Sequence, residues 1–583
     1  MSTTEKKIAI VGCGPRGLSA LESLYSELSK STISTLVKTV VFERTGNFGN
    51  GQVYNCEQNS ANWLNVAGRE VAIEKRESFN YNQNEIPSFP SFQDWLNLEK
   101  TDKTKADYYP KRSELGTYLN ERFTTLYEGL SKAGVIQKQQ EEVIDIECKN
   151  NQVKLLTSQK NEYLADEVLL TIGHQNTETH EQIKRWTEYA NKNDSTSFFQ
   201  KPYPINEFLN GKIINAQSKI ALRGFGLSMM DVVRAIAVES GGNFSHVNEP
   251  GDKMIYISGR NTPKKLIPFS LNGLPMHPKP FNEIVDSWFL PSKKQKNQLI
   301  SQITKAKENI DKVQSPDFLV KAMAPIIAEV YLNLENHLYV DLKEVSIENL
   351  IVDWVLHDKN NELCMSPETP IKSQLEQYVL MASGKANITL DYCIGQVWRH
   401  FHPTLYQELS HTNFPPEIMA DIIALDQKCK RLTFGPPVAS LQQLIALMDA
   451  KILTVRVIDD PDIALTEKGW ELDAEDTEIT ANIMINTVLD NPTLLEVKTP
   501  LIKNLVKKGI LKSVHEKLGT KILKNAVAVS NNESEYKNIS MLGRLTIGSV
   551  FGVDAISECF GNRQILWARG VVKRLSENKI KNK

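Results

Sequence analysis

The chain has 583 residues, of which 41% are hydrophobic and 24% charged, and its formal net charge is −2. A chain of this length exceeds one hydrophobic core, so we expect a globular protein of two to four domains. The near-balanced charge gives no indication of a nucleic-acid partner, and no apolar run is long enough for a transmembrane helix.

The first predicted element is a buried strand that runs into a glycine-rich turn. The apolar run 8–11 is typical of a strand covered on both faces of a parallel sheet. After it, Gly12 permits a tight turn, Gly14 lets the backbone approach a diphosphate, and Gly17 allows the next helix to pack closely. The start of that helix offers free N–H groups to the diphosphate. The predicted cofactor contacts of this turn are Gly12, Gly14, Pro15, Arg16 and Gly17.

A second strand, LVKTVVFER, ends at Glu43. A carboxylate at that place accepts hydrogen bonds from the ribose hydroxyls of an adenosine, and Arg44 lies beside it. The spacing from Gly17 is 43 − 17 = 26 residues, somewhat longer than the usual spacing of about 20. Because two-nucleotide flavoproteins usually begin with this motif, we expect FAD here rather than NAD.

The segment after Glu43 is rich in Gly and Asn, which suits turns that approach a ligand. Trp63 and Asn65 are candidates for lining a flavin, and an ordinary loop with a buried Trp is the alternative. A helix is predicted over 112–130 and a hairpin over 143–158. A further buried strand, 168–172, ends at Gly173, which we expect beside the cofactor.

A second nucleotide-binding signal lies in SKIALRGFGLSMMDVVRAIAV. It predicts a strand, a turn through Gly224 and Gly226, and a helix that Ser228 is suited to cap. Met229 replaces the third glycine of the motif. The next predicted strand, MIYISGR, ends at Arg260 without an acid, and an Arg there suits the 2′-phosphate of NADPH. A unit that serves only as scaffold is the alternative.

The remaining chain predicts three domains. We expect an FAD-binding Rossmann domain over 1–180, completed by 541–575, and a second, NAD(P)-binding-like Rossmann domain over 181–280. The region 281–540 reads as a mainly helical substrate or lid domain. Near the end, Gly552 and Asp554 follow a late strand and are expected beside the flavin or its ribityl chain.

Other chemistries find little support. His400 and His402 lack neighbouring ligands at suitable spacing, so no metal site is predicted. Motifs of serine hydrolases, zincins and P-loop NTPases are absent from the sequence. The seven cysteines have no short spacing, which fits reduced thiols, and the start lacks the apolar core of a signal peptide. We therefore expect a cytoplasmic protein.

The motifs GCGPRGLSALE, YYPKRSELGTYL, LRGFGLSMMDV, SGR followed by NGLP, RLTFGPP and GRLTIGSVFGVD together resemble the large bacterial FAD/NAD(P)-binding protein family. That family is similar to the flavin-dependent N-hydroxylating monooxygenases of amino acids and diamines, and some relatives oxidise the amine of aspartate. The resemblance implies FAD at Gly12, Gly14, Gly17 and Glu43, and a nicotinamide site around Gly224, Gly226 and Ser228. It assigns no substrate residues.

The sequence thus predicts an α/β flavoprotein with two dinucleotide-binding Rossmann units and a large helical insert. We expect an FAD-dependent, NADPH-using monooxygenase that oxidises a small amine or amino-acid-like substrate with O₂. An oxidase or dehydrogenase that uses FAD alone, with a vestigial second site, is one alternative. A non-catalytic flavin-binding interaction protein is another. The sequence identifies neither the substrate nor catalytic residues nor the oligomeric state.

Overall fold

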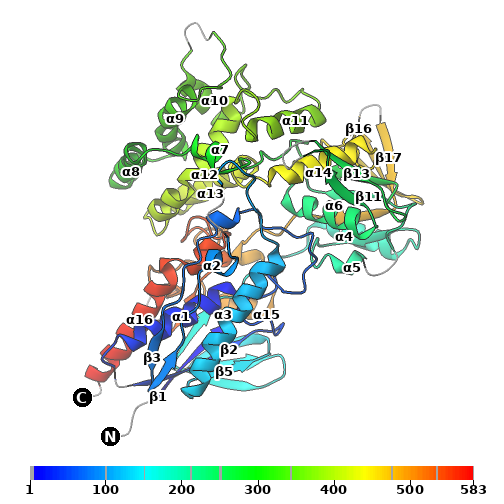
Figure 1. Cartoon of the computed structure of the whole chain (residues 1–583). Coiled ribbons are helices and arrows are strands. Elements are labelled where there is room, and N and C mark those ends of the chain that lie inside the picture. Colours follow the sequence, from blue (N-terminus) through cyan, green and yellow to red (C-terminus); the bar gives the residue numbers. More distant parts are fainter. Residues whose placement is uncertain are drawn as a thin grey trace.

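The computed structural model describes residues 5–33, 35–98, 102–149, 152–209, 213–248, 253–341, 345–474, 477–532 and 536–581. Two units are built on parallel sheets, and a third region consists of helices (Figure 1). In Figure 1 the first sheet lies at the lower left with both termini, the second sheet at the right, and the helical region at the top. The predicted α/β class with parallel sheets is confirmed.

The first sheet contains five parallel strands in the order β19-β9-β1-β2-β5. The strand predicted before Gly12 is the central one, and the strand predicted to end at Glu43 is its neighbour. Both strand predictions are confirmed. The bounds are β1 (Glu5–Val11), β2 (Leu36–Phe42), β5 (Ile136–Gln139), β9 (Glu167–Leu170) and β19 (Ile539–Met541).

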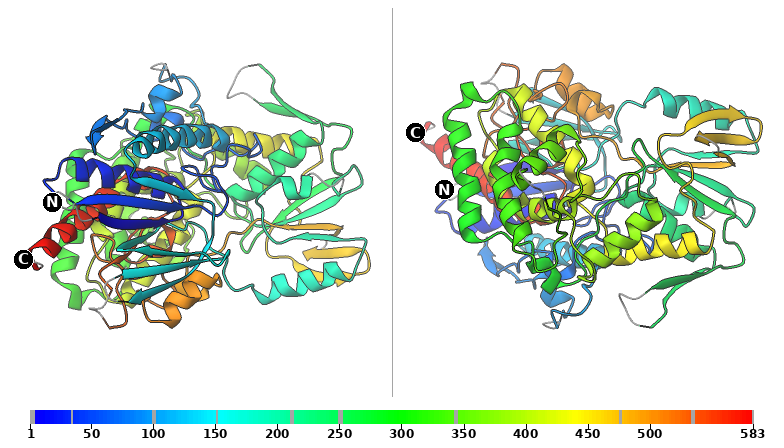
Figure 2. Two further views of the ribbon diagram at one scale, coloured as in Figure 1. Left: turned by 90° about the horizontal axis from the view of Figure 1, so that it is seen from below. Right: turned by 90° about the horizontal axis from the view of Figure 1, so that it is seen from above.

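The two faces of the first sheet are covered by different layers (Figure 2). Ile8 and Ile10 of β1 pack in one core with α1 (Pro15–Ser29), α3 (Arg112–Lys132) and α16 (Asn562–Lys581). Ala9 and Val11 pack in another core with the antiparallel strands β6 (Val143–Lys149), β7 (Gln152–Thr157) and β8 (Glu162–Ala165). Burial on both faces explains why the run 8–11 is wholly apolar. Smaller elements of this unit are β3 (Phe79–Tyr81), β4 (Asn84–Ile86), α2 (Phe92–Trp95) and α15 (Pro500–Lys507).

The second sheet has four parallel strands in the order β10-β18-β11-β14. Ile220 and Leu222 of β11 pack with α6 (Leu227–Glu239), whereas Ala221 faces α4 and a three-stranded antiparallel sheet. The bounds are β10 (Ser197–Phe199), β11 (Lys219–Arg223), β14 (Lys265–Phe269), β18 (Ile483–Asn486), α4 (Glu181–Asn191), α5 (Asn206–Leu209), β15 (Asp462–Thr466), β16 (Gly469–Ala474) and β17 (Thr477–Ala481).

The second unit differs from the prediction in two places. The region 281–540, expected to be mainly helical, contains β15 to β18, and β18 lies inside the second sheet because Ile483 pairs with Ile220. A short apolar run cannot be told from part of a buried helix by periodicity alone, and its partner is far away in the chain. The predicted strand MIYISGR forms β13 (Met254–Ile257), which pairs antiparallel with β12 (Asn243–His246) outside the parallel sheet.

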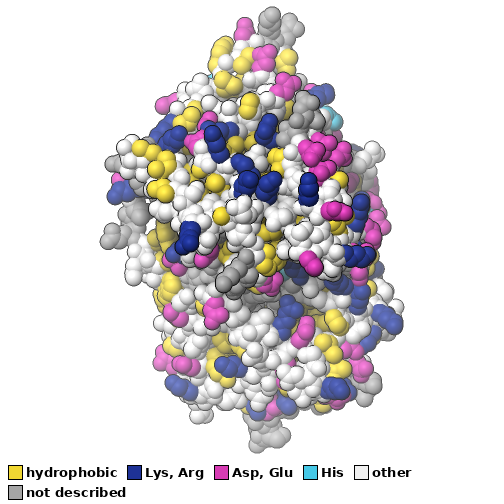
Figure 3. Space-filling model, turned by 90° about the vertical axis from the view of Figure 1, so that its right-hand side faces the viewer, with side chains coloured by type: hydrophobic (Ala, Val, Ile, Leu, Met, Phe, Trp, Pro, Cys, Tyr) yellow, Lys and Arg dark blue, Asp and Glu magenta, His cyan; other side chains and the backbone are white. Residues whose placement is uncertain are grey.

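The helical region is formed by the part of the chain between β14 and β15. Its elements are α7 (Glu283–Ser287), α8 (Lys293–Glu308), α9 (Asp317–Leu332), α10 (Ile347–His357), α11 (Ile371–Ala382), α12 (Leu390–Leu409), α13 (Pro416–Thr433) and α14 (Val438–Asp449). Among the described residues, we find no helix that is both long and apolar enough to cross a bilayer. On the face drawn in Figure 3, basic and acidic side chains are interspersed, in keeping with the small net charge.

Glu22 of α1 is the buried acid that joins α1 to its neighbours. It accepts hydrogen bonds from Arg122 Nε at 2.8 Å and Arg76 Nη1 at 2.9 Å, and all three side chains are buried. We expect Glu22→Gln to lower the free energy of unfolding by about 3–5 kcal/mol, because it leaves two guanidinium groups without a buried counter-charge. Thermal unfolding followed by circular dichroism measures the loss.

The matched control is Glu27→Gln on the same helix, where the partner Arg569 is 61% exposed. Such a pair contributes less than about 1 kcal/mol. Equal melting temperatures for the two variants would contradict a structural role of Glu22.

Candidate cofactor and substrate cavity

A cavity of about 2200 Å³ lies where the two parallel sheets and the helical region meet. Residues at the carboxyl ends of four strands line it, among them Gly12, Thr171, Gly224 and Ser270. Ligands of parallel α/β sheets bind at this edge. The predicted site residues that line the cavity are Gly12, Gly14, Pro15, Arg16, Glu43, Arg44, Trp63, Asn65, Gly173, Gly224, Gly226, Ser228 and Asp554.

The glycines of the first turn have different physical roles. Gly12 has a φ of +89°, and a Cβ there would lie 2.6 Å from the carbonyl oxygen of Thr171. Gly17 does not line the cavity. A Cβ on it would collide with the Gly12 carbonyl oxygen, so glycine is needed here for the close packing of the helix beneath the turn. Gly14 is extended, with a φ of −79°, and the closest atom to its Cβ position is Gly51 Cα at 3.6 Å. Only Gly14 therefore leaves room for a ligand.

Glu43 is held in place at the end of β2. Its carboxylate accepts hydrogen bonds from the backbone N–H of Cys13 at 3.1 Å and from the Thr45 hydroxyl at 2.8 Å. Arg44 is half-exposed and lies 3.6 Å from Glu142. A fixed carboxylate at the end of such a strand is the type of group that accepts hydrogen bonds from the ribose hydroxyls of an adenosine.

Trp63 and Asn65 line the cavity between the two units. The guanidinium of Arg234 lies over the Trp63 ring at 3.9 Å from its centre. Asp231 of α6 pairs with Arg234 at 3.1 Å and with Arg112 of α3 at 2.8 Å. These contacts join the second unit to the first directly beside the cavity.

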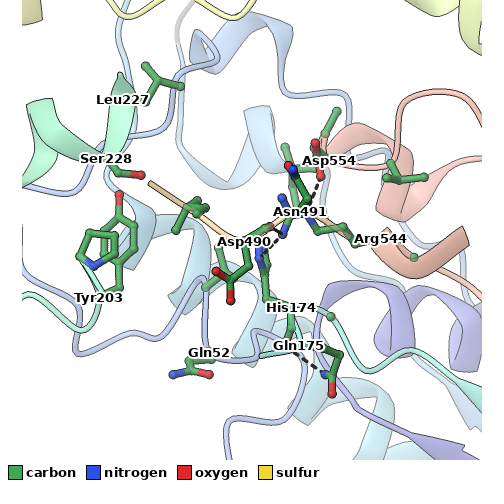
Figure 4. A pocket seen from close by; sticks show the side chains of 18 of the residues that line it. Gln52, His174, Gln175, Tyr203, Leu227, Ser228, Asp490, Asn491, Arg544 and Asp554 are labelled. Atoms are coloured by element: carbon green, nitrogen blue, oxygen red, sulfur yellow. Dashed lines mark hydrogen bonds and ion pairs between the residues drawn. The ribbon is translucent and has the colours of Figure 1, made fainter. Parts of the chain in front are cut away.

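The second turn repeats the geometry of the first. Gly224 has a φ of +115°, and a Cβ there would lie 2.7 Å from Thr487 Oγ1. Gly226 is extended at the start of α6, and its Cβ position is 3.9 Å from the nearest atom, Met276 Sδ. Ser228 was predicted to cap α6, but Gly226 occupies that position and Ser228 faces the hydroxyl of Tyr203 instead (Figure 4).

Besides Gly17, two predicted residues do not line the cavity. Arg260 is exposed at the far end of α6, where the N–H of Asn261 donates to the Ser240 carbonyl. A helix of 13 residues is about 20 Å long, so Arg260 is far from the turn at Gly226. The prediction placed Arg260 after a strand of the sheet, whereas β13 belongs to a separate hairpin. Gly552 lines a small neighbouring cavity, where its Cβ position is 2.7 Å from His402 Cε1.

Asp554 belongs to a charged network that lines the cavity (Figure 4). It pairs with Lys430 at 2.8 Å and with Arg544 at 3.0 Å, and Arg544 contacts His174 Nδ1 at 2.7 Å. Burial acts to raise the pKa of Asp554, but the two cations hold it below its usual range. Burial and the charge of Arg544 lower the pKa of His174 to about 4, so this imidazole is neutral near pH 7.

Several cavity residues were not anticipated from the sequence. They come from segments far apart in the chain: Glu70, Lys279, Arg399, Lys430 and Glu558. Burial raises the pKa of Glu558 to about 8, although Arg16 opposes this rise, and burial lowers the pKa of Lys279 to about 8. No local motif marks these residues, because they are far apart in the sequence and become neighbours of the same cavity only when the chain folds.

The cavity fits two dinucleotides. At both turns a Cβ on the second glycine would meet no atom closer than 3.6 Å, and a helix begins directly behind it. The buried side chain of Asn50, which lines the wall beside the first turn, has an Oδ1 atom without a protein partner. The first turn and Glu43 would hold FAD, and the second turn would hold a nicotinamide dinucleotide.

Comparison with known proteins gives two partial relatives. Nitrosuccinic acid synthase of Aspergillus oryzae is 26% identical over 260 residues, which cover 44% of this chain and 39% of that protein. The uncharacterized protein YdhS of Escherichia coli is 25% identical over 252 residues, 40% of each chain. The match therefore spans about two fifths of the length of these relatives.

Among solved structures, ornithine hydroxylase from Pseudomonas aeruginosa aligns with 98% of this chain at 12% identity, with a TM-score of 0.42. A family model described as FAD-NAD(P)-binding matches residues 9–175. This segment contains the first glycine turn, Glu43, Trp63 and Gly173. Residues 9–175 are thus similar to an FAD-NAD(P)-binding domain.

Proposed function

We propose that the protein is an FAD-dependent, NADPH-using monooxygenase that oxidises a small amine or amino-acid-like compound with O₂. One observation carries this proposal: two glycine turns, each at the carboxyl edge of its own parallel sheet, open into one cavity. Two dinucleotides bound there can meet, as hydride transfer between them requires. The relative from Aspergillus oryzae is named for nitrosuccinic acid, a product with an oxidised nitrogen, and this supports an amine as substrate.

The chain's own residues would bind and orient the cofactors. We assign FAD to the first unit, with its diphosphate at Gly14 and its adenosine ribose at Glu43, and the nicotinamide dinucleotide to the turn at Gly226. When bound, FAD supplies the redox chemistry and the activation of O₂. With Arg260 outside the cavity, Arg223 is the cation that supports a preference for NADPH, since it lines the wall and bonds to the uncharged amides of Gln182 and Asn486 at 3.1 Å.

The helical region would complete the substrate cavity. Arg399 and His402 of α12 and Lys430 of α13 line the same cavity as the two turns. A wall built from a separate region encloses the reacting atoms and limits access of water. We propose the domain assignment in revised form: the FAD unit includes 541–575, and the second unit includes β15 to β18.

The first prediction separates the two nucleotide sites. Gly14→Val adds a side chain where the FAD diphosphate would lie, while the backbone conformation and the nearest neighbour at 3.6 Å tolerate a Cβ. We expect a folded protein that binds FAD at least about tenfold more weakly, a loss of about 1.4 kcal/mol or more. FAD content by absorbance and the melting temperature measure the two properties.

The matched variant is Gly226→Val, whose backbone and surroundings are equally permissive. It should keep its FAD but lose most of the rate of flavin reduction by NADPH in stopped-flow measurements. Stoichiometric FAD in the Gly14→Val protein would contradict the first site, and normal reduction of the Gly226→Val protein would contradict the second.

A further prediction tests the activity itself. The purified protein with FAD should show bleaching of the flavin by NADPH, faster than by NADH, and oxygen consumption that an amine or amino acid stimulates. Mass spectrometry of the product should show added oxygen on nitrogen. A flavin that NADPH leaves oxidised would instead favour an oxidase or dehydrogenase that uses FAD alone.

A further inference from the structure

The segment that follows the motif NGLP, residues 276–279, packs against the motif RLTFGPP at the cavity wall, and the nucleotide sites use neither motif. The N–H of His277 donates to the Arg431 carbonyl at 3.0 Å, and the N–H of Lys279 donates to the Pro436 carbonyl at 2.9 Å. A Cβ on Gly435 would collide with the carbonyl oxygen of His277, so only glycine permits this approach. The two segments therefore hold each other in one fixed arrangement.

The same segment is held from the helical region. The Tyr392 hydroxyl donates to the Pro278 carbonyl at 3.0 Å, and Gln396 Nε2 donates to it at 3.3 Å. Both donors belong to α12 and are buried. The peptide group between Pro278 and Lys279 is thus fixed through both its carbonyl and its N–H, which makes the position of the Lys279 side chain well defined.

Lys279 is a buried cation without a protein partner. Its side chain lines the cavity, and the residue is 8% exposed. Across the described ranges of the chain, no acceptor lies within hydrogen-bond or ion-pair distance of its Nζ. A buried ammonium without a hydrogen-bonded partner is costly, so a partner from outside the protein is favoured.

The acids near Lys279 are already paired with arginines. Asp107 lies 2.7 Å from Arg69, Glu70 lies 3.3 Å from Arg399, and Asp286 contacts both arginines as well as His400 at 3.2 Å. Glu70 and Asp286 favour the charged form of Lys279 at longer range, whereas Arg69 and Arg399 disfavour it. Unlike these carboxylates, Lys279 has no ion-pair partner among the described residues.

We propose that the Lys279 ammonium binds a carboxylate of the substrate, so that the enzyme selects amines that carry a carboxylate over amines that lack one. This inference rests on the proposed function and specifies its substrate class. An ammonium in a buried wall forms strong charge-assisted hydrogen bonds with a carboxylate. Anchoring the carboxylate would hold the amine at a set distance from the cofactor.

The ionisation of Lys279 agrees with this role. Burial lowers its pKa to about 8, so the side chain is charged at pH 7 and loses its proton as the pH rises through 8. A carboxylate ligand stabilises the charged form, so its affinity should be full below this pH and fall above it. An arginine at this position would stay charged throughout.

The test uses the FAD-loaded protein, with succinate as the probe, because succinate stays ionised from pH 7 to pH 10 and contains no amine. Isothermal titration calorimetry should show binding to the natural protein and at least tenfold weaker binding to Lys279→Met. Lys279→Arg should retain affinity and lose the decline above pH 8. The uncharged diamide of succinate should fail to compete. Lys103→Met, which removes an exposed lysine paired with Glu283 at 2.7 Å, is the control and should bind succinate normally.

Melting temperature and FAD content establish that each variant is folded. Equal affinity of Lys279→Met and the natural protein for succinate, or no binding by the natural protein, would overturn the proposal. Lysine-dependent binding of succinate by a protein that NADPH does not reduce would support the anchor and refute the monooxygenase. Reduction of the flavin by NADPH, without Lys279-dependent binding of succinate, would support the monooxygenase and refute the anchor.

Discussion

The carboxylate of Asp231 determines how the two nucleotide units are placed relative to each other. It accepts from Arg112 of α3 at 2.8 Å, from Arg234 at 3.1 Å and from the Tyr203 hydroxyl at 2.7 Å. Arg112 belongs to the first unit and the other three residues to the second. One buried acid between two guanidinium groups is strongly held, since separating the units would leave Arg112 without its buried counter-charge. The distance between the two glycine turns depends on this contact.

That arrangement also sets the charge of the cavity. Asp231 balances only one of its two arginines, and Arg234 places its excess charge over the ring of Trp63. Around Lys279, the carboxylates of Asp107, Glu70 and Asp286 pair with Arg69 and Arg399, and Lys279 has no direct partner among the described residues. A cavity with surplus positive charge is suited to the phosphates of dinucleotides and to anionic groups of a substrate.

Sequence patterns predicted the elements whose chemistry is local. The run 8–11, Gly12 and Glu43 are neighbours within one β-α-β unit, so their spacing alone indicates the turn and its strands. Prediction became unreliable where distant segments combine. Arg260 follows a strand with the right composition, but that strand pairs with β12 and not with β11. Lys279 could not be recognised, because its surroundings come from α12 and the segment 431–437.

The order of the strands in the first sheet has a consequence for biosynthesis. β19 at residues 539–541 pairs with β9, and α16 packs on α1, so the amino-terminal unit gains its last strand and last helix from the end of the chain. A ribosome that synthesises this chain releases β1 hundreds of residues before its sheet can be completed. Until then β9 presents an unpaired edge, of the kind that other chains can join. Truncations from the carboxyl terminus should therefore damage the domain that begins the chain.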